Sequence, residues 1–242
     1  MKIAFVGASG YGNVGDDTYP LVFAQRLAGH EVLFYNSDLP DHLPSDLGLL
    51  VIGGGGVLHN VGSAAAPQEA GSPHFCCMKF YMDAAIGMGI PWGFLSCGLQ
   101  FRRPYEPGLN ASLHPWAEYL RQAHFITLRS ASCVRIVSQV SGREDALFFP
   151  DAAYLLDSPP PDTGRQMRNC VTLVPAGRVN ATDAQITYYL RQIMSSGTSV
   201  AWLSMGSPKD DGHLLEQAAA LFPTSEIIAR PLPQEAFARI AS

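Results

Sequence analysis

Short apolar runs alternate with segments of helical spacing along most of the chain. Residues 3–6, 31–36, 47–52 and 91–96 are rich in apolar side chains, and in segments such as 21–27 the apolar residues recur every three or four positions. Strands that lack a regular polar alternation are buried on both faces, and strands that alternate with helices form parallel sheets. The pattern predicts an α/β protein made of Rossmann-like, doubly wound parallel sheets.

A proline-rich segment interrupts this alternation. Residues 157–168 include Pro159, Pro160 and Pro161, and consecutive prolines form an extended spacer. The predicted strands beyond it are residues 170–174, 199–204 and 225–229. We therefore expect a first domain at 1–156, a linker at 157–168 and a second domain at 169–242. Three strands make a small sheet for this architecture, so we expect the second domain to be truncated and the natural protein to be longer.

A glycine-rich stretch, residues 7–17, follows the first predicted strand and precedes a helix. Backbone N–H groups in such a loop, together with the positive end of a helix dipole, bind anions. The candidate ligand contacts are Gly10, Tyr11, Gly12, Asn13 and Gly15. The stretch is not the dinucleotide-binding fingerprint, because position 9 is serine and the spacing that begins at Gly10 ends in an aspartate pair. The alternative is that the glycines only form a tight turn.

The start of this helix is predicted from its proline. Pro20 lacks an N–H group, so we expect it in the first helical turn. Asp17 or Thr18 is then the N-cap.

Two further strand ends carry candidate site residues. A second glycine run follows the third strand, and its candidate contacts are Gly54, Gly55, Gly56 and His59. For His59, the alternative is a loop histidine that bonds to backbone. Arg129 follows the strand at 125–128, and it either contacts an anion or pairs with an acidic neighbour such as Asp151. Carboxyl ends of parallel strands share one edge of a sheet, where ligands bind.

The helix after Arg129 has clear end signals. Ser130 or Ser132 is expected to cap its N-terminus, and Gly142 to end it.

The composition and net charge of the chain limit the classes of partner that we expect. Sixteen basic and 21 acidic residues give a net charge of −5, which does not favour nucleic acid. No apolar stretch reaches the roughly 18 residues of a membrane-spanning helix, and no secretion signal is recognised at the start. The five cysteines lack paired metal spacing, so we expect reduced thiols in a cytoplasmic protein without a metal.

Three motifs in order resemble the polysaccharide pyruvyl transferase family. They are residues 12–17 (Gly-Asn-Val-Gly-Asp-Asp), the four glycines at 53–56, and Arg129 with Ser132 ahead of Asp151. The family usually has an Asn-x-Gly-Asp segment, a four-glycine loop, an Arg-Asp…Ser segment and a later aspartate. The resemblance spans most of residues 1–156 and is weaker over 170–211.

The resemblance implies a GT-B-like pair of domains and a transferase. Its donor substrate is phosphoenolpyruvate, with no further cofactor, and its acceptor is a sugar of a cell-surface polysaccharide or its precursor, either free or membrane-associated. Asp16, Asp17 and Arg129 are the implied catalytic residues, with the aspartates accepting hydrogen bonds from sugar hydroxyls. The helix-cap role of Asp17 remains the alternative. The oligomeric state is left open.

The chain also departs from the family. Ser130 stands where an acidic residue is common, and Cys97-Gly98-Leu99 replaces a more glycine-rich stretch. The family's Arg-x-His segment has no counterpart before Ser242, so we expect an incomplete active site in this chain. Two other functions stay open: a GT-B glycosyltransferase that uses a nucleotide sugar, and a non-catalytic module that binds sugar or nucleotide.

Overall fold

The computed structural model describes most of the first two thirds of the chain and short pieces of the rest. The described residues are 1–10, 12–36, 40–59, 73–99, 109–157, 170–173, 188, 191–192, 199–203, 205, 216, 219–220 and 226–228. The chain forms two compact units, residues 1–10 with 19–155 and residues 11–18 with 156–242. Residues 158–168 of the predicted linker lie outside the described residues, so the domain boundary stays a prediction.

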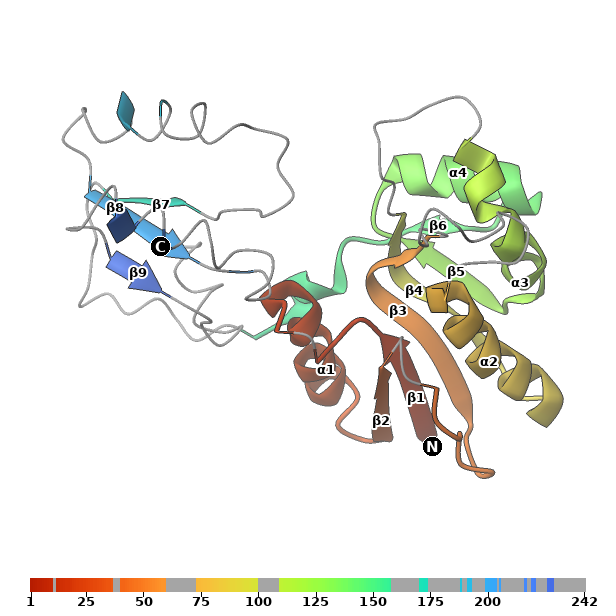
Figure 1. Cartoon of the computed structure of the whole chain (residues 1–242). Helices are drawn as coiled ribbons and strands as arrows, with labels where there is room; N and C mark the ends of the chain where they lie inside the picture. The colour runs from red at the N-terminus through yellow and green to blue at the C-terminus, as the bar shows by residue number, and fades with distance from the viewer. Residues whose placement is uncertain are drawn as a thin grey trace. The chain divides into compact units, whose positions relative to one another are not determined.

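The first unit contains a six-stranded parallel sheet in the order β2-β1-β3-β4-β5-β6 (Figure 1). Its strands are β1 (Lys2–Gly7), β2 (Glu31–Asn36), β3 (Leu49–Leu58), β4 (Trp92–Leu99), β5 (Phe125–Leu128) and β6 (Leu147–Phe148). The predicted α/β fold with a parallel sheet is therefore confirmed for this unit. The bounds predicted for β2 and β5 agree with the structure.

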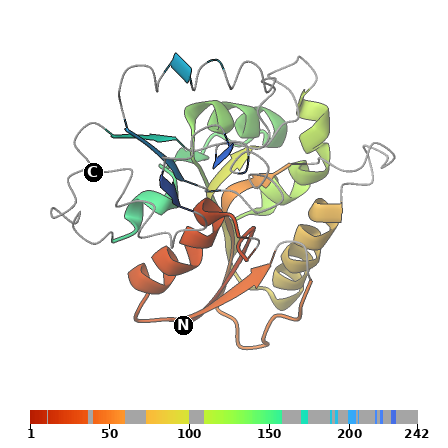
Figure 2. The same cartoon turned by 60° about the vertical axis from the view of Figure 1, so that its left-hand side comes forward.

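Helices cover both faces of this sheet (Figure 2). The helices are α1 (Val14–Arg26), α2 (Pro73–Met88), α3 (Ala117–Gln122) and α4 (Ala131–Ser141), with the 3-10 helices η1 (Leu109–Trp116) and η2 (Ala152–Leu155). Phe5 of β1 stacks on Phe23 of α1, with ring centroids 4.0 Å apart. Ala4 and Val6 point to the opposite face and belong to the main core, which includes Met78 of α2. Alternating side chains of one central strand therefore join two layers of helices.

The main core is dense in aromatic side chains whose polar atoms are bonded. Trp92, Trp116, Tyr81 and Phe94 are all fully buried. The indole N–H of Trp116 donates to the carbonyl of His59 at 3.0 Å, and the Tyr81 hydroxyl accepts from the backbone N–H of Asp41 at 3.0 Å. Burial raises the pKa of Tyr81 to about 12, so its hydroxyl stays neutral. The core thus joins α2 and η1 to the sheet without leaving these groups unpaired.

Predicted helix ends were right for α4 and wrong for α1. Ser130 caps α4 by accepting from the N–H of Cys133 at 3.2 Å, and Gly142 ends it with a φ of 73°. Helix α1 begins at Val14, ahead of the predicted caps, because the Asn13 side chain accepts from the N–H of Gly15 at 3.0 Å. Pro20 therefore lies inside the helix.

The second unit contains a three-stranded parallel sheet in the order β7-β8-β9. Its strands are β7 (Cys170–Leu173), β8 (Ser199–Leu203) and β9 (Glu226–Ile228), close to the predicted ranges. The first turn of α1 belongs to this unit. The N–H of Val14 donates to the carbonyl of Met205 at 2.9 Å, and Val14 packs with buried Leu203.

Within the described ranges, no helix has both the length and the apolar character needed to cross a bilayer.

Substitutions of two glycines test the assigned end of α4. Gly142→Ala should destabilise the protein by about 1 kcal/mol, because alanine is strained at the left-handed φ of 73° although no atom lies near its added methyl group. Gly87→Ala, in the last turn of α2 with open space around it, should be neutral or stabilise by up to about 1 kcal/mol. Urea denaturation followed by circular dichroism measures both. Equal effects of the two substitutions would contradict the assigned end of α4.

Candidate functional site

The carboxyl ends of the parallel strands form one edge of the first unit's sheet, and several predicted residues lie there. Gly7 ends β1, Gly98 lies next to the last residue of β4, and Arg129 directly follows β5. The N–H of Arg129 donates to the carbonyl of Cys97 at 3.0 Å, so the backbone extends the pairing of β4 and β5. Ligands of open parallel sheets bind at this edge.

The four glycines at 53–56 were predicted as a loop, and this prediction was wrong. Strand β3 continues through them to Leu58, with Gly53 opposite Leu95 and Gly55 opposite Cys97 of β4. A Cβ atom on Gly53 would lie 2.4 Å from the carbonyl oxygen of Leu95. The missing side chain therefore allows close approach of two strands, and pairing with β4 holds Gly53 and Gly55 in the sheet, with an irregular register after Gly55.

A tyrosine ring occupies the space beside Gly54, where a ligand was predicted to bind. The φ of Gly54 is 81°, and a Cβ atom there would lie 2.4 Å from Cδ2 of Tyr19. Tyr19 comes from α1, and only 5% of its surface is exposed. Gly55, with a φ of 79°, is also buried, and Gly56 is partly buried. The glycine run is thus largely covered by protein atoms.

The guanidinium of Arg129 lies against Gly98 of β4. A Cβ atom on Gly98 would lie 2.2 Å from the Nε of Arg129, so a larger residue there would displace the guanidinium. One Nη donates to the carboxylate of Asp151 at 3.2 Å, and 37% of the Arg129 side chain is exposed. Burial opposes the charge of the guanidinium, but nearby Tyr19 and Asp151 favour it, and the net effect raises the Arg129 pKa. The guanidinium of Arg129 therefore stays positively charged.

The predicted pairing of Arg129 with Asp151 is confirmed, and it uses one of the five N–H donors of the guanidinium. In the described part of the chain, Asp151 is the one acceptor bonded to this side chain. The remaining N–H donors of the guanidinium fork are thus able to bind an anion, which is the other role considered for Arg129.

Asp151 is held by a network that the sequence did not reveal. Its Oδ1 accepts from the Tyr19 hydroxyl at 2.8 Å and from the N–H of Ala153 at 3.1 Å. Beside it, buried Ser96 donates through its hydroxyl to the carbonyl of Pro150 at 3.1 Å and accepts from the N–H of Ala152 at 2.8 Å. Ser96 has a φ of 53°, which is rare for a residue other than glycine and costs about 1–3 kcal/mol. Strained backbone of this kind clusters at functional sites. The sequence around Ser96 contains no local signal that predicts it.

The first glycine loop divides between the two units. Gly10, with a φ of 94°, belongs to the first unit, and Tyr11 lies outside the described residues. The other predicted residues of this loop, Gly12, Asn13, Gly15, Asp16 and Asp17, belong to the second unit. Asp16 and Asp17 therefore belong to a different unit from Arg129.

Local geometry limits what the start of α1 can bind. Asn13 is its cap, and Asp16 and Asp17 lie in its first turn, where carboxylates stabilise the helix dipole. Two negative charges at this N-terminus disfavour an anionic ligand there. Carboxylates do accept hydrogen bonds from hydroxyl groups, so a sugar remains a suitable partner.

His59 lies among aromatic residues at the base of α2. Its ring stacks on His74, with centroids 4.1 Å apart and an interplanar angle of 14°. A ring nitrogen of His74 lies 2.9 Å from the carbonyl of Val57, and Trp116 bonds to the His59 carbonyl. These contacts give His59 a structural role and do not link it to Arg129. No group of three potential metal-binding side chains is found among the described residues.

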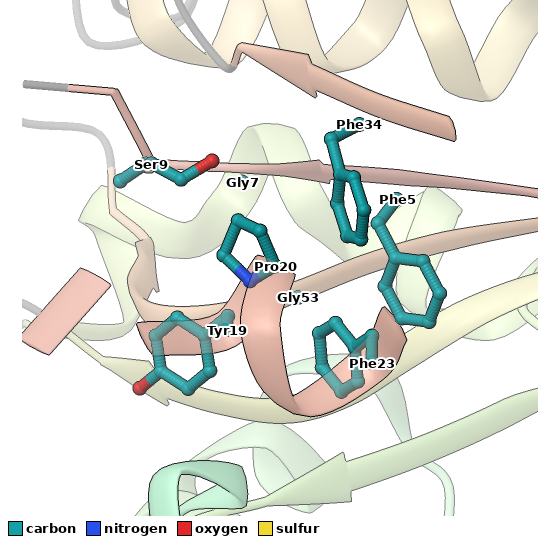
Figure 3. Close-up of a pocket in the computed structure, with 9 residues that line it drawn as sticks. Phe5, Gly7, Ser9, Tyr19, Pro20, Phe23, Phe34 and Gly53 are labelled. Atoms are coloured by element: carbon teal, nitrogen blue, oxygen red, sulfur yellow. The ribbon is translucent and has the colours of Figure 1, made fainter. Parts of the chain in front are cut away.

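A small hollow lies at the carboxyl end of β1 (Figure 3). Its lining is Phe5, Gly7, Ala8, Ser9, Tyr19, Pro20, Phe23, Phe34 and Gly53, and the cavity volume is about 10 Å³. A cavity of this volume holds about one water molecule. The hollow alone therefore does not hold a nucleotide.

The sheet order, the helices on both faces and the glycine-lined edge define a Rossmann-like α/β protein. No protein-family profile matches the chain, and no curated protein matches it. A solved structure of an alpha-glucosyltransferase in complex with UDP and a mismatched 13-mer DNA is similar to it with a TM-score of 0.51 and 15% identity, over 100% of this chain and 70% of that chain. An uncharacterized protein of Klebsiella pneumoniae has a TM-score of 0.39 and 12% identity, over 93% and 92% of the two chains. The likeness to the glucosyltransferase concerns the fold.

The contact between Gly54 and Tyr19 gives a stability test. Gly54→Ala should lower the free energy of unfolding by about 2–4 kcal/mol, because it combines a strained φ with overlap of a buried ring. Gly29→Ala is the matched control, since no atom lies within 4 Å of its added methyl group. Urea denaturation compares the two. A loss below about 1 kcal/mol for Gly54→Ala would contradict the packing described.

Proposed function

We propose that this chain is a polysaccharide pyruvyl transferase-like protein. It transfers a pyruvyl group from phosphoenolpyruvate to a sugar of a cell-surface polysaccharide or its precursor. The observation that carries the proposal is Arg129 at the carboxyl edge of the sheet, with its guanidinium on Gly98 and most of its N–H donors not used by Asp151. The order of the three sequence motifs supports the same family, and a glycosyltransferase-like fold is compatible with a sugar acceptor.

The charge of the donor explains why an arginine is needed. Phosphoenolpyruvate carries a carboxylate and a phosphate, and a guanidinium binds either group through two parallel N–H···O bonds. In the reaction, the enol carbon takes a proton and a sugar hydroxyl attacks the neighbouring carbon. A second hydroxyl of the sugar then displaces the phosphate, so that the product is a ketal. Arg129 would hold the anionic donor during these steps.

The acceptor would be bound by acidic side chains. Asp16 and Asp17 are the candidates, because their carboxylates accept hydrogen bonds from sugar hydroxyls and one of them could take the hydroxyl proton. This assignment is part of the proposal, as are the GT-B-like pairing of the two units and the cytoplasmic location. No cofactor besides the donor substrate is required.

Binding of phosphoenolpyruvate tests the proposal directly. The wild-type chain should be stabilised by phosphoenolpyruvate in a thermal-shift titration, by about 2.7 kcal/mol at 100 times the dissociation constant. Arg129→Lys should weaken binding at least about tenfold, because lysine keeps the charge and loses the planar fork. Gly98→Ala should act in the same direction, since the new methyl group displaces the guanidinium.

The matched control is Arg121→Lys. Arg121 lies on α3 and pairs with Glu118 at 2.7 Å on the surface, away from the strand ends. This variant should bind phosphoenolpyruvate as the wild type does. A wild-type chain that does not respond to saturating phosphoenolpyruvate would refute the proposed donor, and equal affinity in Arg129→Lys would refute the role of Arg129.

A second candidate function is a glycosyltransferase that uses a nucleotide sugar. It is favoured by the similar fold of the glucosyltransferase whose structure contains UDP. The same titration with UDP and UDP-glucose separates the two candidates. Stabilisation by UDP-glucose together with no response to phosphoenolpyruvate would favour the glycosyltransferase.

A further inference from the structure

Tyr19 stands between two parts of the site that are distant in sequence. Its ring lies on the backbone of Gly54, and its hydroxyl reaches Asp151, 132 positions further along the chain, at 2.8 Å. The ring is almost fully buried, so it has little freedom to move. In Figure 3, Tyr19 projects from α1 beside the backbone of Gly53. Its hydroxyl therefore has a defined position relative to the sheet.

The two oxygens of Asp151 have different partners. Oδ1 accepts from the Tyr19 hydroxyl and from the N–H of Ala153, whereas Oδ2 accepts from Arg129 at 3.2 Å. A carboxylate beside a guanidinium commonly forms two parallel bonds of about 2.7–2.9 Å. Here the pair is joined by one bond, and this bond is longer than usual. Oδ1 has two other donors, and only Oδ2 is bonded to Arg129.

We propose that Tyr19 is a positioning residue of the Arg129 site. Its hydroxyl holds Asp151 in an orientation that takes one N–H of Arg129 and leaves the rest of the fork for an anionic ligand. The inference rests on the proposed function only in that Arg129 binds an anion.

The loss of the Tyr19 hydroxyl would show why the orientation of Asp151 matters. Without the Tyr19 hydroxyl, Oδ1 loses one of its two donors, and Asp151 can rotate to bind Arg129 through both oxygens. A fully paired guanidinium must break these charge-assisted bonds before it can bind a ligand. Asp151 then competes with the ligand, whereas in the observed arrangement it steadies the arginine. A tyrosine suits this task because its hydroxyl donates a hydrogen bond to Asp151 without bringing a charge of its own.

The glycines at this edge support the same arrangement. Gly98 leaves the space that the guanidinium occupies, and Gly54 leaves the space that the Tyr19 ring occupies. The side chains of Tyr19 and Arg129 therefore pack against backbone atoms of the sheet, which have little freedom to move. This explains why a tyrosine on a helix and an arginine after a strand can be fixed relative to one carboxylate.

Tyr19→Phe is the direct test, because it keeps the ring on Gly54 and removes the hydroxyl. The probes are phosphoenolpyruvate and inorganic phosphate, titrated by isothermal calorimetry. We expect affinity for the anion to fall about tenfold, as for the loss of a hydrogen bond to a charged group. The matched control is Tyr119→Phe, which removes a similar bond from a tyrosine hydroxyl to Asp83 (2.7 Å) on the surface and should leave affinity unchanged.

A double-mutant cycle distinguishes positioning from general destabilisation. Asp151→Asn removes the competing negative charge, so adding Tyr19→Phe to it should cost less than about twofold in affinity. If the loss from Tyr19→Phe is the same with and without Asp151→Asn, Tyr19 does not act through Asp151 and the inference is overturned.

A crystal structure of Tyr19→Phe gives a readout that does not depend on any ligand. Asp151 should be joined to Arg129 by two bonds in the variant, and an unchanged single bond would overturn the inference. If the wild type binds phosphate but not phosphoenolpyruvate, the proposed donor fails and the role of Tyr19 is still decided by the phosphate titrations. If neither anion binds, the proposed function fails and the crystal structure alone decides whether Tyr19 orients Asp151.

Discussion

Close contact between strand backbones is the constraint on which the first unit depends. A Cβ atom on Gly7 would lie 2.6 Å from the carbonyl oxygen of Gly53, and one on Gly53 would lie 2.4 Å from that of Leu95. Gly93 is similarly placed, 2.4 Å from the carbonyl oxygen of Phe125. These atoms belong to the backbone, so no side-chain rotation can relieve a collision. The sheet from β1 to β5 therefore requires glycine at these positions.

The same absence of side chains shapes the site. At Gly54 of β3 and Gly98 of β4, the bare backbone leaves space for an aromatic ring and a guanidinium. Glycine-rich segments of this kind are usually expected to bring backbone N–H groups to a ligand. In this protein, Gly54 and Gly98 instead receive the side chains of Tyr19 and Arg129, and the arginine presents the positive charge. The positive charge at this edge thus comes from a side chain that packs against glycine.

Much of the fold was predictable because its signals are local. The strands β2 and β5, the serine cap and the glycine end of α4 follow from apolar runs and from end signals that act over a few residues. The extent of β3 was not predictable in this way, because a glycine run disfavours a strand and it is the pairing with β4 that holds this run in the sheet. The start of α1 was missed because Asn13 caps it ahead of the proline that suggested a later beginning.

The sequence by itself determined the α/β class, the parallel direction of the strands and the position of Arg129 after a strand, because alternation and spacing express these features along the chain. Only the tertiary structure decided which partners meet at the sheet edge. The hydroxyl of Tyr19 donates to Asp151, which is 132 positions further along the chain, and the guanidinium of Arg129 packs against Gly98. Such contacts depend on the packing of distant segments, and neither residue type nor spacing along the chain encodes that packing.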